Sequence, residues 1–161
     1  MINRAHIDNL KHLSIEYSKN IPYPHIVLDD FLANDKAEIL FKSHEEYFNN
    51  SESEKIDYST LDAIKYASVG YPKVNEDSEE ILEFFLGNEI TSFLSTLTGI
   101  KEPLISDREF FGGGFHFINK GGYLNVHVDF NKHPINKLDR RINIILFLNK
   151  EWKEEWNGDL Q

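Results

Sequence analysis

Cysteine is absent from this 161-residue sequence, which also contains only five prolines, two tryptophans and one methionine. Without cysteine, the chain can form no disulfide, present no thiolate nucleophile and offer no sulfur ligand to a metal ion. Any metal site must therefore be built from histidine, aspartate or glutamate side chains.

Basic residues and long apolar runs are also scarce. Seventeen Lys and Arg residues stand against 27 Asp and Glu residues, a formal net charge of −10. Such a surface repels phosphate backbones and anionic lipids, so we expect neither nucleic acid nor membrane partners, although a local basic pocket for a small anion remains compatible with this charge. No apolar run approaches membrane-spanning length, and the opening "MINRAHIDNLKHL" carries His6 and Asp8 where a signal peptide needs an apolar core. We expect a cytoplasmic protein.

The composition is typical of a folded domain, with 40% hydrophobic, 27% charged and 13% aromatic residues. The length suits one domain spanning residues 1–161. Apolar side chains at helical spacing, with polar or glycine residues at the ends, predict helices in the first part of the chain. These helices are expected over residues 5–19, over residues 34–48, and from Ser78 to Gly99 with a break near Gly87. "HIVLDDFL" predicts a short strand and "NNSESEKIDYST" predicts a loop.

The character of the sequence changes after residue 103. Aromatic and β-branched residues interrupted by glycines predict strands joined by turns. Residues 1–100 are therefore expected to form a mainly helical support region, and residues 101–161 the β-rich core. The predicted fold class is α+β, with the N-terminal helices packed against one side of a sheet.

The segment "YLNVHVDF", residues 123–130, carries the clearest chemical signal. Successive strand residues point to opposite faces, so Tyr123, Asn125, His127 and Asp129 are expected to share one face, opposite an aliphatic face. Neutral imidazole and carboxylate are the ligands that iron(II) and its neighbours take when thiolate is absent. His-x-Asp therefore predicts a metal site, although a solvated strand face with an incidental ion pair would give the same pattern.

The segment "NKGG", residues 119–122, predicts a tight hairpin because its glycines tolerate the backbone angles of such turns. With Lys120 and Gly121 as the two-residue loop, His116 lies diagonal to His127 on the neighbouring strand. A shift of the loop by one residue places the two histidines directly opposite each other. Either register gathers His116, His127 and Asp129.

The run "FFGGGFHFINKGGYLNVHVDFN", followed by "DRRINIILFLNKEW" and "NGDLQ", resembles the iron(II)- and 2-oxoglutarate-dependent oxygenases of the prolyl 4-hydroxylase-like group. "PYPHIVLDDFL" is similar to the strand and turn that often open such domains. The resemblance implies a double-stranded β-helix, or jelly roll, that binds Fe(II) through two histidines and one carboxylate. It also implies 2-oxoglutarate as a cofactor that is decarboxylated while a substrate is hydroxylated.

The resemblance also implies roles for individual residues. His127 and Asp129 match the first two metal ligands, while Asn125, Tyr123 and Asn143 are candidates for binding 2-oxoglutarate. His116 and Arg141, together with Arg140, are candidates for the pocket wall. The segment from Ile142 to Leu148 is expected to be a core strand buried on both sides. Trp152 and Trp156 are expected to pack rather than to border the site.

One part of the family pattern has no counterpart. The family's third ligand is a histidine several strands after His-x-Asp, followed by an Arg or Lys that binds the far carboxylate of 2-oxoglutarate. Here the only later histidine is His133, and the last basic residue is Lys153. The preferred interpretation is a jelly roll incomplete at the C-terminus; the alternatives are a degenerate form with a two-ligand site or no metal site, or a third ligand from His116 or a partner chain. Unpaired strand edges would then favour a homodimer or a strand swap.

The leading hypothesis is an iron(II)- and 2-oxoglutarate-dependent dioxygenase, a prolyl-hydroxylase-like hydroxylase that is inactive in this form. Its substrate is a small molecule or a peptidyl group that the sequence does not identify. The alternative is a noncatalytic binding or interaction module on a degenerate jelly-roll scaffold. A metal-dependent hydrolase is a third option.

Overall fold

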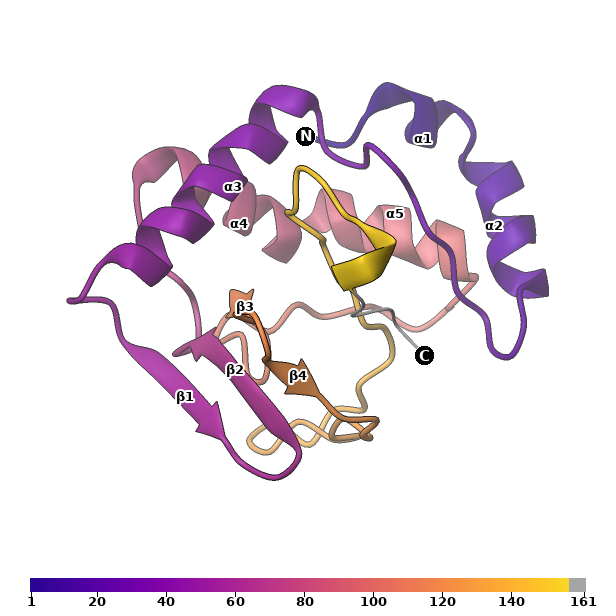
Figure 1. Cartoon of the computed structure of the whole chain (residues 1–161). Helices are drawn as coiled ribbons and strands as arrows, with labels where there is room; N and C mark the ends of the chain where they lie inside the picture. The colour runs from indigo at the N-terminus through magenta and orange to yellow at the C-terminus, as the bar shows by residue number, and fades with distance from the viewer. Residues whose placement is uncertain (157–161) are drawn as a thin grey trace. The chain divides into compact units, whose positions relative to one another are not determined.

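The computed structural model describes residues 1–156 and divides into two compact units (Figure 1). Unit 1 consists of Met1–Ser43 and Lys73–Arg108, and unit 2 consists of His44–Pro72 and Glu109–Gln161. The predicted strand in "NGDLQ" lies outside the described residues.

Helices make up unit 1. The helix predicted over residues 5–19 is two helices, because the backbone turns at Asn9 with φ −102° and ψ 8°. The helix predicted over residues 34–48 is confirmed; it continues across the boundary between the units. The helical bounds are α1 Arg4–Asp8, α2 Leu10–Lys19, α3 Asn34–Asn49, α4 Glu76–Leu86 and α5 Asn88–Thr98.

Local capping explains where α4 and α5 begin and end. The Asn75 side chain accepts from the Ser78 backbone N–H at 2.9 Å, so Asn75, rather than the predicted Ser78, is the N-cap of α4. Ser78 completes a capping box as the third helical residue. The predicted break at Gly87 is confirmed, and α5 ends at Gly99, whose φ of 73° favours glycine.

The core of unit 1 is aliphatic and aromatic. Ile81 and Ile90 are 0% and 1% exposed, and the Phe31 and Phe93 rings lie 5.7 Å apart. The strand predicted in "HIVLDDFL" is wrong: only Leu32 forms a bridge, with Ile2. A single bridge leaves that segment without the ladder that defines a strand.

The sheet of unit 2 begins with β1 (Lys55–Ser59) and β2 (Ala63–Ser68), which pair antiparallel from Lys55 opposite Ser68 to Ser59 opposite Ile64. The sequence predicted a loop over β1, and this is wrong. Polar composition favoured the loop, but pairing with β2 supplies the hydrogen bonds that make the segment a strand.

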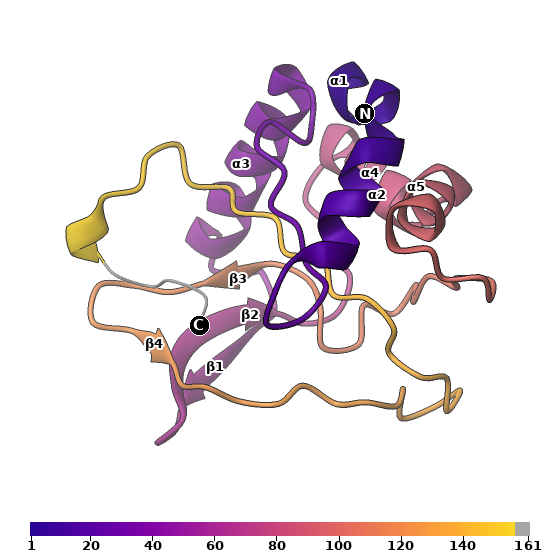
Figure 2. The same ribbon diagram turned by 90° about the vertical axis from the view of Figure 1, so that its right-hand side faces the viewer.

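The other edge of β2 carries β3 (His116–Phe117) and β4 (Tyr123–Leu124), both antiparallel to β2. The predicted tight turn is present, since the Gly122 N–H donates to the Asn119 carbonyl at 2.8 Å across Lys120 and Gly121. The predicted hairpin is wrong, because β3 and β4 follow one another along β2 instead of pairing together (Figure 2). Residues 118–122 loop outward opposite Lys65. Gly122 permits the return, since a Cβ there would lie 2.6 Å from the carbonyl oxygen of Ile64.

The predicted strand over residues 123–130 is correct only at its start. The Asn125 amide still donates to the Asp62 carbonyl at 2.8 Å, but β2 begins at Ala63 and gives later residues no ladder. The expected core strand from Ile142 to Leu148 is also wrong. Ile145 and Phe147 are 52% and 60% exposed, and no strand is assigned over that stretch of the described chain.

Helix and antiparallel sheet together make the fold α+β, as predicted. The helical region predicted for residues 1–100 also contains β1 and β2, so two strands of the sheet come from the first half of the chain. Within residues 1–156, no helix is long and apolar enough to cross a membrane.

Candidate metal centre

The backbone carbonyl of Asn125 holds the His127 ring in one orientation. Its Nδ1 lies 2.8 Å from the carbonyl oxygen of Asn125, an acceptor, so Nδ1 carries the proton and donates. The lone pair is then on Nε2, the nitrogen left to face a metal. The local chain thus prepares the tautomer that a ligand requires.

The Asp129 carboxylate is oriented in a complementary way. Its Oδ2 accepts from Asn143 Nδ2 at 3.3 Å and lies 3.4 Å from Arg140 Nη1. Arg140 also donates to Asn143 Oδ1 at 2.9 Å and lies 4.8 Å from the centre of the Phe130 ring. These contacts occupy Oδ2 and leave Oδ1 directed to His127.

The two candidate ligand atoms lie close together. His127 Nε2 and Asp129 Oδ1 are 3.4 Å apart, and the side chains are 47% and 45% exposed. A separation of this size lets one cation contact both atoms, given metal–ligand bonds of about 2.0–2.2 Å. Among residues 1–156 no group of three histidine or acidic side chains is placed to hold a metal.

His116 lies beside Lys65 rather than in a hairpin with His127. Lys65 Nζ donates to His116 Nδ1 at 3.1 Å and lies 5.2 Å from the centre of the Tyr58 ring. Burial lowers the pKa of Lys65, and the negative charge of Asp129 offsets part of that effect. Pairing of β3 with β2 therefore brings His116 beside Lys65.

Two histidines of unit 2 are kept neutral. Desolvation, reinforced by the Lys65 charge, lowers the pKa of His116 to about 4. Burial lowers the pKa of His44, whose Nε2 donates to the His116 carbonyl at 2.8 Å. The His44 ring also packs 5.2 Å from Phe115.

The side chains of Tyr123 and Asn125 face the turn between β1 and β2. Asn125 Nδ2 donates to the Leu61 carbonyl at 3.2 Å, and the Tyr123 hydroxyl lies 3.4 Å from the same oxygen. Their contacts are thus structural, and binding of 2-oxoglutarate by either residue stays a prediction. Asn143 is part of the candidate site because its side chain donates to Asp129.

Two further candidates occupy other positions. Arg141 is exposed, and its charge helps to lower the pKa of Asp139 after the larger effect of Lys132. His133 Nδ1 accepts from the backbone N–H groups of Ile135 and Asn136 at 3.2 and 3.3 Å. These hydrogen bonds stabilise the turn that contains His133.

Residues 113–161 match the family model of the 2OG-Fe(II) oxygenase superfamily. This segment contains His127, Asp129, Arg140 and Asn143, the four residues of the centre described above. The match covers less than half of the chain and names the superfamily, without distinguishing a prolyl 4-hydroxylase-like group. No curated protein and no solved structure matches the chain.

The side chains present fit two positions of the Fe(II) site implied by the superfamily. The donors are one imidazole nitrogen and one carboxylate oxygen, a set typical of nonhaem iron(II). Each ligand has its second polar atom engaged, as metal-binding residues generally do. A bound iron would supply the binding and activation of dioxygen, and the chain itself would contribute the orientation of the two ligands.

Lys65 was not among the residues predicted from the sequence. Arg140 was predicted only as a neighbour of Arg141 in the pocket wall. Lys65 is 51 residues before His116, and the pairing of β2 with β3 brings the two side chains together. The signal that could have identified Lys65 is its position between Ala63 and Ala67, which lie on the same face of the strand. Arg140 and Arg141 are adjacent in the sequence, so their positions did not indicate which of them would contact Asp129.

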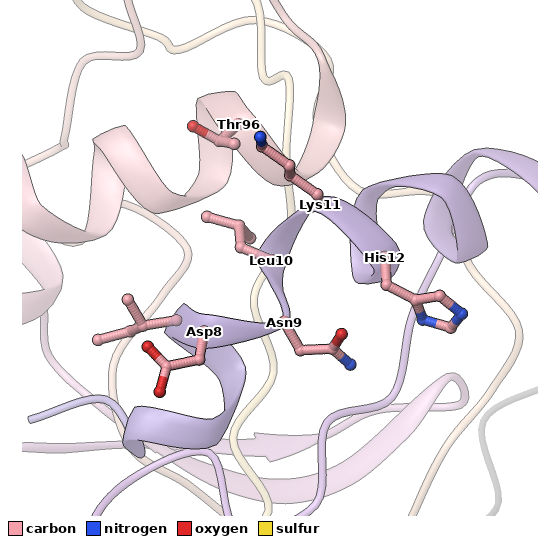
Figure 3. A pocket seen from close by; sticks show the side chains of 7 residues that line it. Asp8, Asn9, Leu10, Lys11, His12 and Thr96 are labelled. Carbon is pink, nitrogen blue, oxygen red and sulfur yellow. The ribbon is translucent and has the colours of Figure 1, made fainter.

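A depression in unit 1 is unrelated to these residues. It measures about 530 Å³ and is lined along the α1–α2 junction and by Thr96 of α5 (Figure 3). Asp8, Lys11 and His12 give it mixed charge. None of the candidate site residues lines it.

Proposed function

We propose that this chain is an iron(II)- and 2-oxoglutarate-dependent dioxygenase of the prolyl-hydroxylase-like type, built on a double-stranded β-helix. His127 and Asp129 supply two metal ligands, and the substrate is a small molecule or a peptidyl group. The observation that carries the proposal is the 3.4 Å approach of His127 Nε2 to Asp129 Oδ1, with Nδ1 and Oδ2 already engaged. The superfamily match over residues 113–161 supports it.

Each residue of the centre has a task in this function. The Asn125 carbonyl fixes the His127 tautomer, and Asn143 and Arg140 hold Asp129 so that one oxygen faces the metal. The half-exposed side chains leave room for 2-oxoglutarate and a substrate beside the metal. Low or absent turnover, expected from the sequence, stays a prediction.

The test uses calorimetric titration of the chain with Mn(II), a redox-stable stand-in for Fe(II), followed by 2-oxoglutarate. We expect Mn(II) binding that is lost in His127→Ala and Asp129→Ala and retained in the matched control His12→Ala. Binding of 2-oxoglutarate should require the metal. Equal Mn(II) binding by all four proteins would contradict the proposal.

The rival function is a noncatalytic binding or interaction module. Exposure of Ile144, Ile145 and Phe147 favours it, since side chains at 45–60% exposure offer an apolar contact surface. This rival predicts no selective binding of Mn(II) and no thermal stabilisation by it. The cytoplasmic location and the lack of nucleic acid and membrane partners stay predictions from charge and sequence.

A further inference from the structure

The Phe130 ring lies against Arg140 beside the candidate metal centre. The guanidinium carbon of Arg140 is 4.8 Å from the centre of the ring, the geometry of a cation–π contact. The Arg140 side chain is 24% exposed, so water weakens this attraction only in part. The Arg140 backbone is fixed separately, because its N–H donates to the Asn131 carbonyl at 2.8 Å. The ring therefore restricts the direction in which the arginine side chain extends.

The same guanidinium contacts the Asp129 carboxylate. Arg140 Nη1 lies 3.4 Å from Asp129 Oδ2, and Arg140 Nη2 donates to Asn143 Oδ1 at 2.9 Å. Asn143 Nδ2 donates to the same carboxylate oxygen at 3.3 Å. Both contacts to Oδ2 therefore depend on where the guanidinium lies.

The position of Arg140 is important because a guanidinium competes with a metal ion for a carboxylate. Arginine forms its strongest carboxylate pairs through two parallel hydrogen bonds, one to each oxygen. An Arg140 side chain that was free to move would adopt that arrangement and occupy Asp129 Oδ1, the oxygen 3.4 Å from His127 Nε2. A guanidinium held on Oδ2 leaves Oδ1 open.

Two residues of the segment before β3 hold the Phe130 ring in place. The Phe111 ring lies 5.5 Å from the Phe130 ring at an interplanar angle of 74°, an edge-to-face contact. Gly112, with a φ of 71°, lies so close that a Cβ at that position would be 2.7 Å from Phe130 Cε1. Packed carbon atoms do not approach so closely, so a side chain at position 112 would displace the ring.

We propose that Phe130 is a positioning residue of the candidate metal centre, and that its ring holds Arg140 on Asp129 Oδ2 so that Oδ1 stays free for a divalent cation. This inference rests on the proposed function and adds to it a residue that the sequence pattern places on the face opposite His127. Phe130 acts through Arg140 rather than as a ligand, and Gly112 makes room for its ring.

The test measures Mn(II) affinity by calorimetry in the wild type, Phe130→Leu and Phe130→Tyr, each with Arg140 present and again with Arg140→Met. We expect Phe130→Leu to lower the affinity about threefold or more, the range of a partly exposed cation–π contact. Phe130→Tyr keeps an aromatic face and should bind as the wild type does. With Arg140→Met no guanidinium competes for Asp129, so Phe130→Leu should have no further effect. A merely structural role of Phe130 would lower the affinity equally in both backgrounds.

A second variant displaces the ring without altering its chemistry. Gly112→Ala should weaken Mn(II) binding, because the added Cβ meets Phe130 Cε1 at 2.7 Å. Gly121→Ala is the matched control, since its φ of 82° imposes comparable backbone strain and a Cβ there meets no described atom within 4 Å. This control should bind Mn(II) as the wild type does.

A third measurement uses the metal-free wild type, so that misfolding of a variant cannot mimic the effect. In NMR spectra the Arg140 side-chain N–H signals should be shifted upfield by the Phe130 ring current, and this shift should be lost in Gly112→Ala. Wild-type Arg140 signals without the shift, unchanged Mn(II) affinity in Phe130→Leu, or an equal loss in both Arg140 backgrounds overturns this inference alone. Failure of the wild type to bind Mn(II) overturns it together with the proposed function.

Discussion

Asn143 Nδ2 donates to Asp129 Oδ2 at 3.3 Å, although 14 residues separate the two along the chain. The sequence suggested Asn143 as a contact for 2-oxoglutarate. The structure gives it a contact with a candidate metal ligand. Together with Arg140, it determines which oxygen of Asp129 faces His127.

Asn143→Ala should weaken Mn(II) binding about tenfold, because second partners of metal ligands typically contribute 10–100-fold to affinity. The substitution removes no charge, so the change reports orientation of Asp129. Mn(II) titration measures it, with Asn119→Ala in the outward loop as control. Unchanged affinity would show that Asn143 does not position the carboxylate.

Stability should fall as the pH is lowered from about 6.5 to about 4. The pKa of His116 is lowered from 6.5 to about 4 in the folded chain, and burial lowers that of His44 as well. Over this interval the unfolded chain binds more protons than the folded chain, so acid favours unfolding. The stabilising contribution is complete above pH 6.5.

Urea unfolding at several pH values measures this dependence. His116→Gln should reduce the slope between pH 6.5 and 4 and leave the pH 8 to 7 interval unaltered. A slope identical to that of the wild type would mean that His116 is not the responsible group.

Gly122→Ala should destabilise the return of the chain to β2. The added Cβ would meet the Ile64 carbonyl oxygen at 2.6 Å, and crowding of this kind typically costs about 1–3 kcal/mol. Hydrogen exchange at the Asn125 amide, which donates to Asp62, should become faster. Gly121→Asn is the control, since a Cβ at position 121 has no neighbour within 4 Å and Asn tolerates its φ of 82°.

Ile81→Ala should lower the free energy of unfolding by about 2–5 kcal/mol, because it removes a fully buried side chain from a packed core. Ile15→Ala, at a residue 53% exposed, should change it by about 0.5 kcal/mol or less. Urea unfolding followed by circular dichroism compares the two. Equal effects would place Ile81 outside the core of unit 1.

We predict self-association from exposed aliphatic side chains in the segment that follows β4. Val126 and Val128 are 85% and 88% exposed, and the sheet gives this segment no ladder beyond Asn125. Such segments recruit a second chain, so we expect a homodimer. Val128→Lys should shift sedimentation toward the monomer; a wild type that stays monomeric at high concentration would refute this expectation.

The features that were predicted correctly from the sequence are those that depend on residues close together along the chain. Helix α3, the break at Gly87 and the end at Gly99 follow from spacing and glycine, and the α+β class follows from the change in composition. The closeness of His127 and Asp129 came from the His-x-Asp spacing.

Other features depend on which strand pairs with which. The glycines at 121 and 122 suggested a hairpin, but β2 provides an edge long enough for both β3 and β4. That pairing moves His116 to Lys65 and ends the strand before His127. Alternation from Ile142 to Leu148 predicted burial, whereas burial requires a neighbouring element, and the described residues provide none.

The most direct measurement is pulsed electron paramagnetic resonance of the chain with one equivalent of Mn(II). The account predicts a nitrogen coupling from a single imidazole, which disappears in His127→Ala and persists in His116→Gln. A spectrum of fully hydrated Mn(II), unaltered by removal of His127, would contradict it.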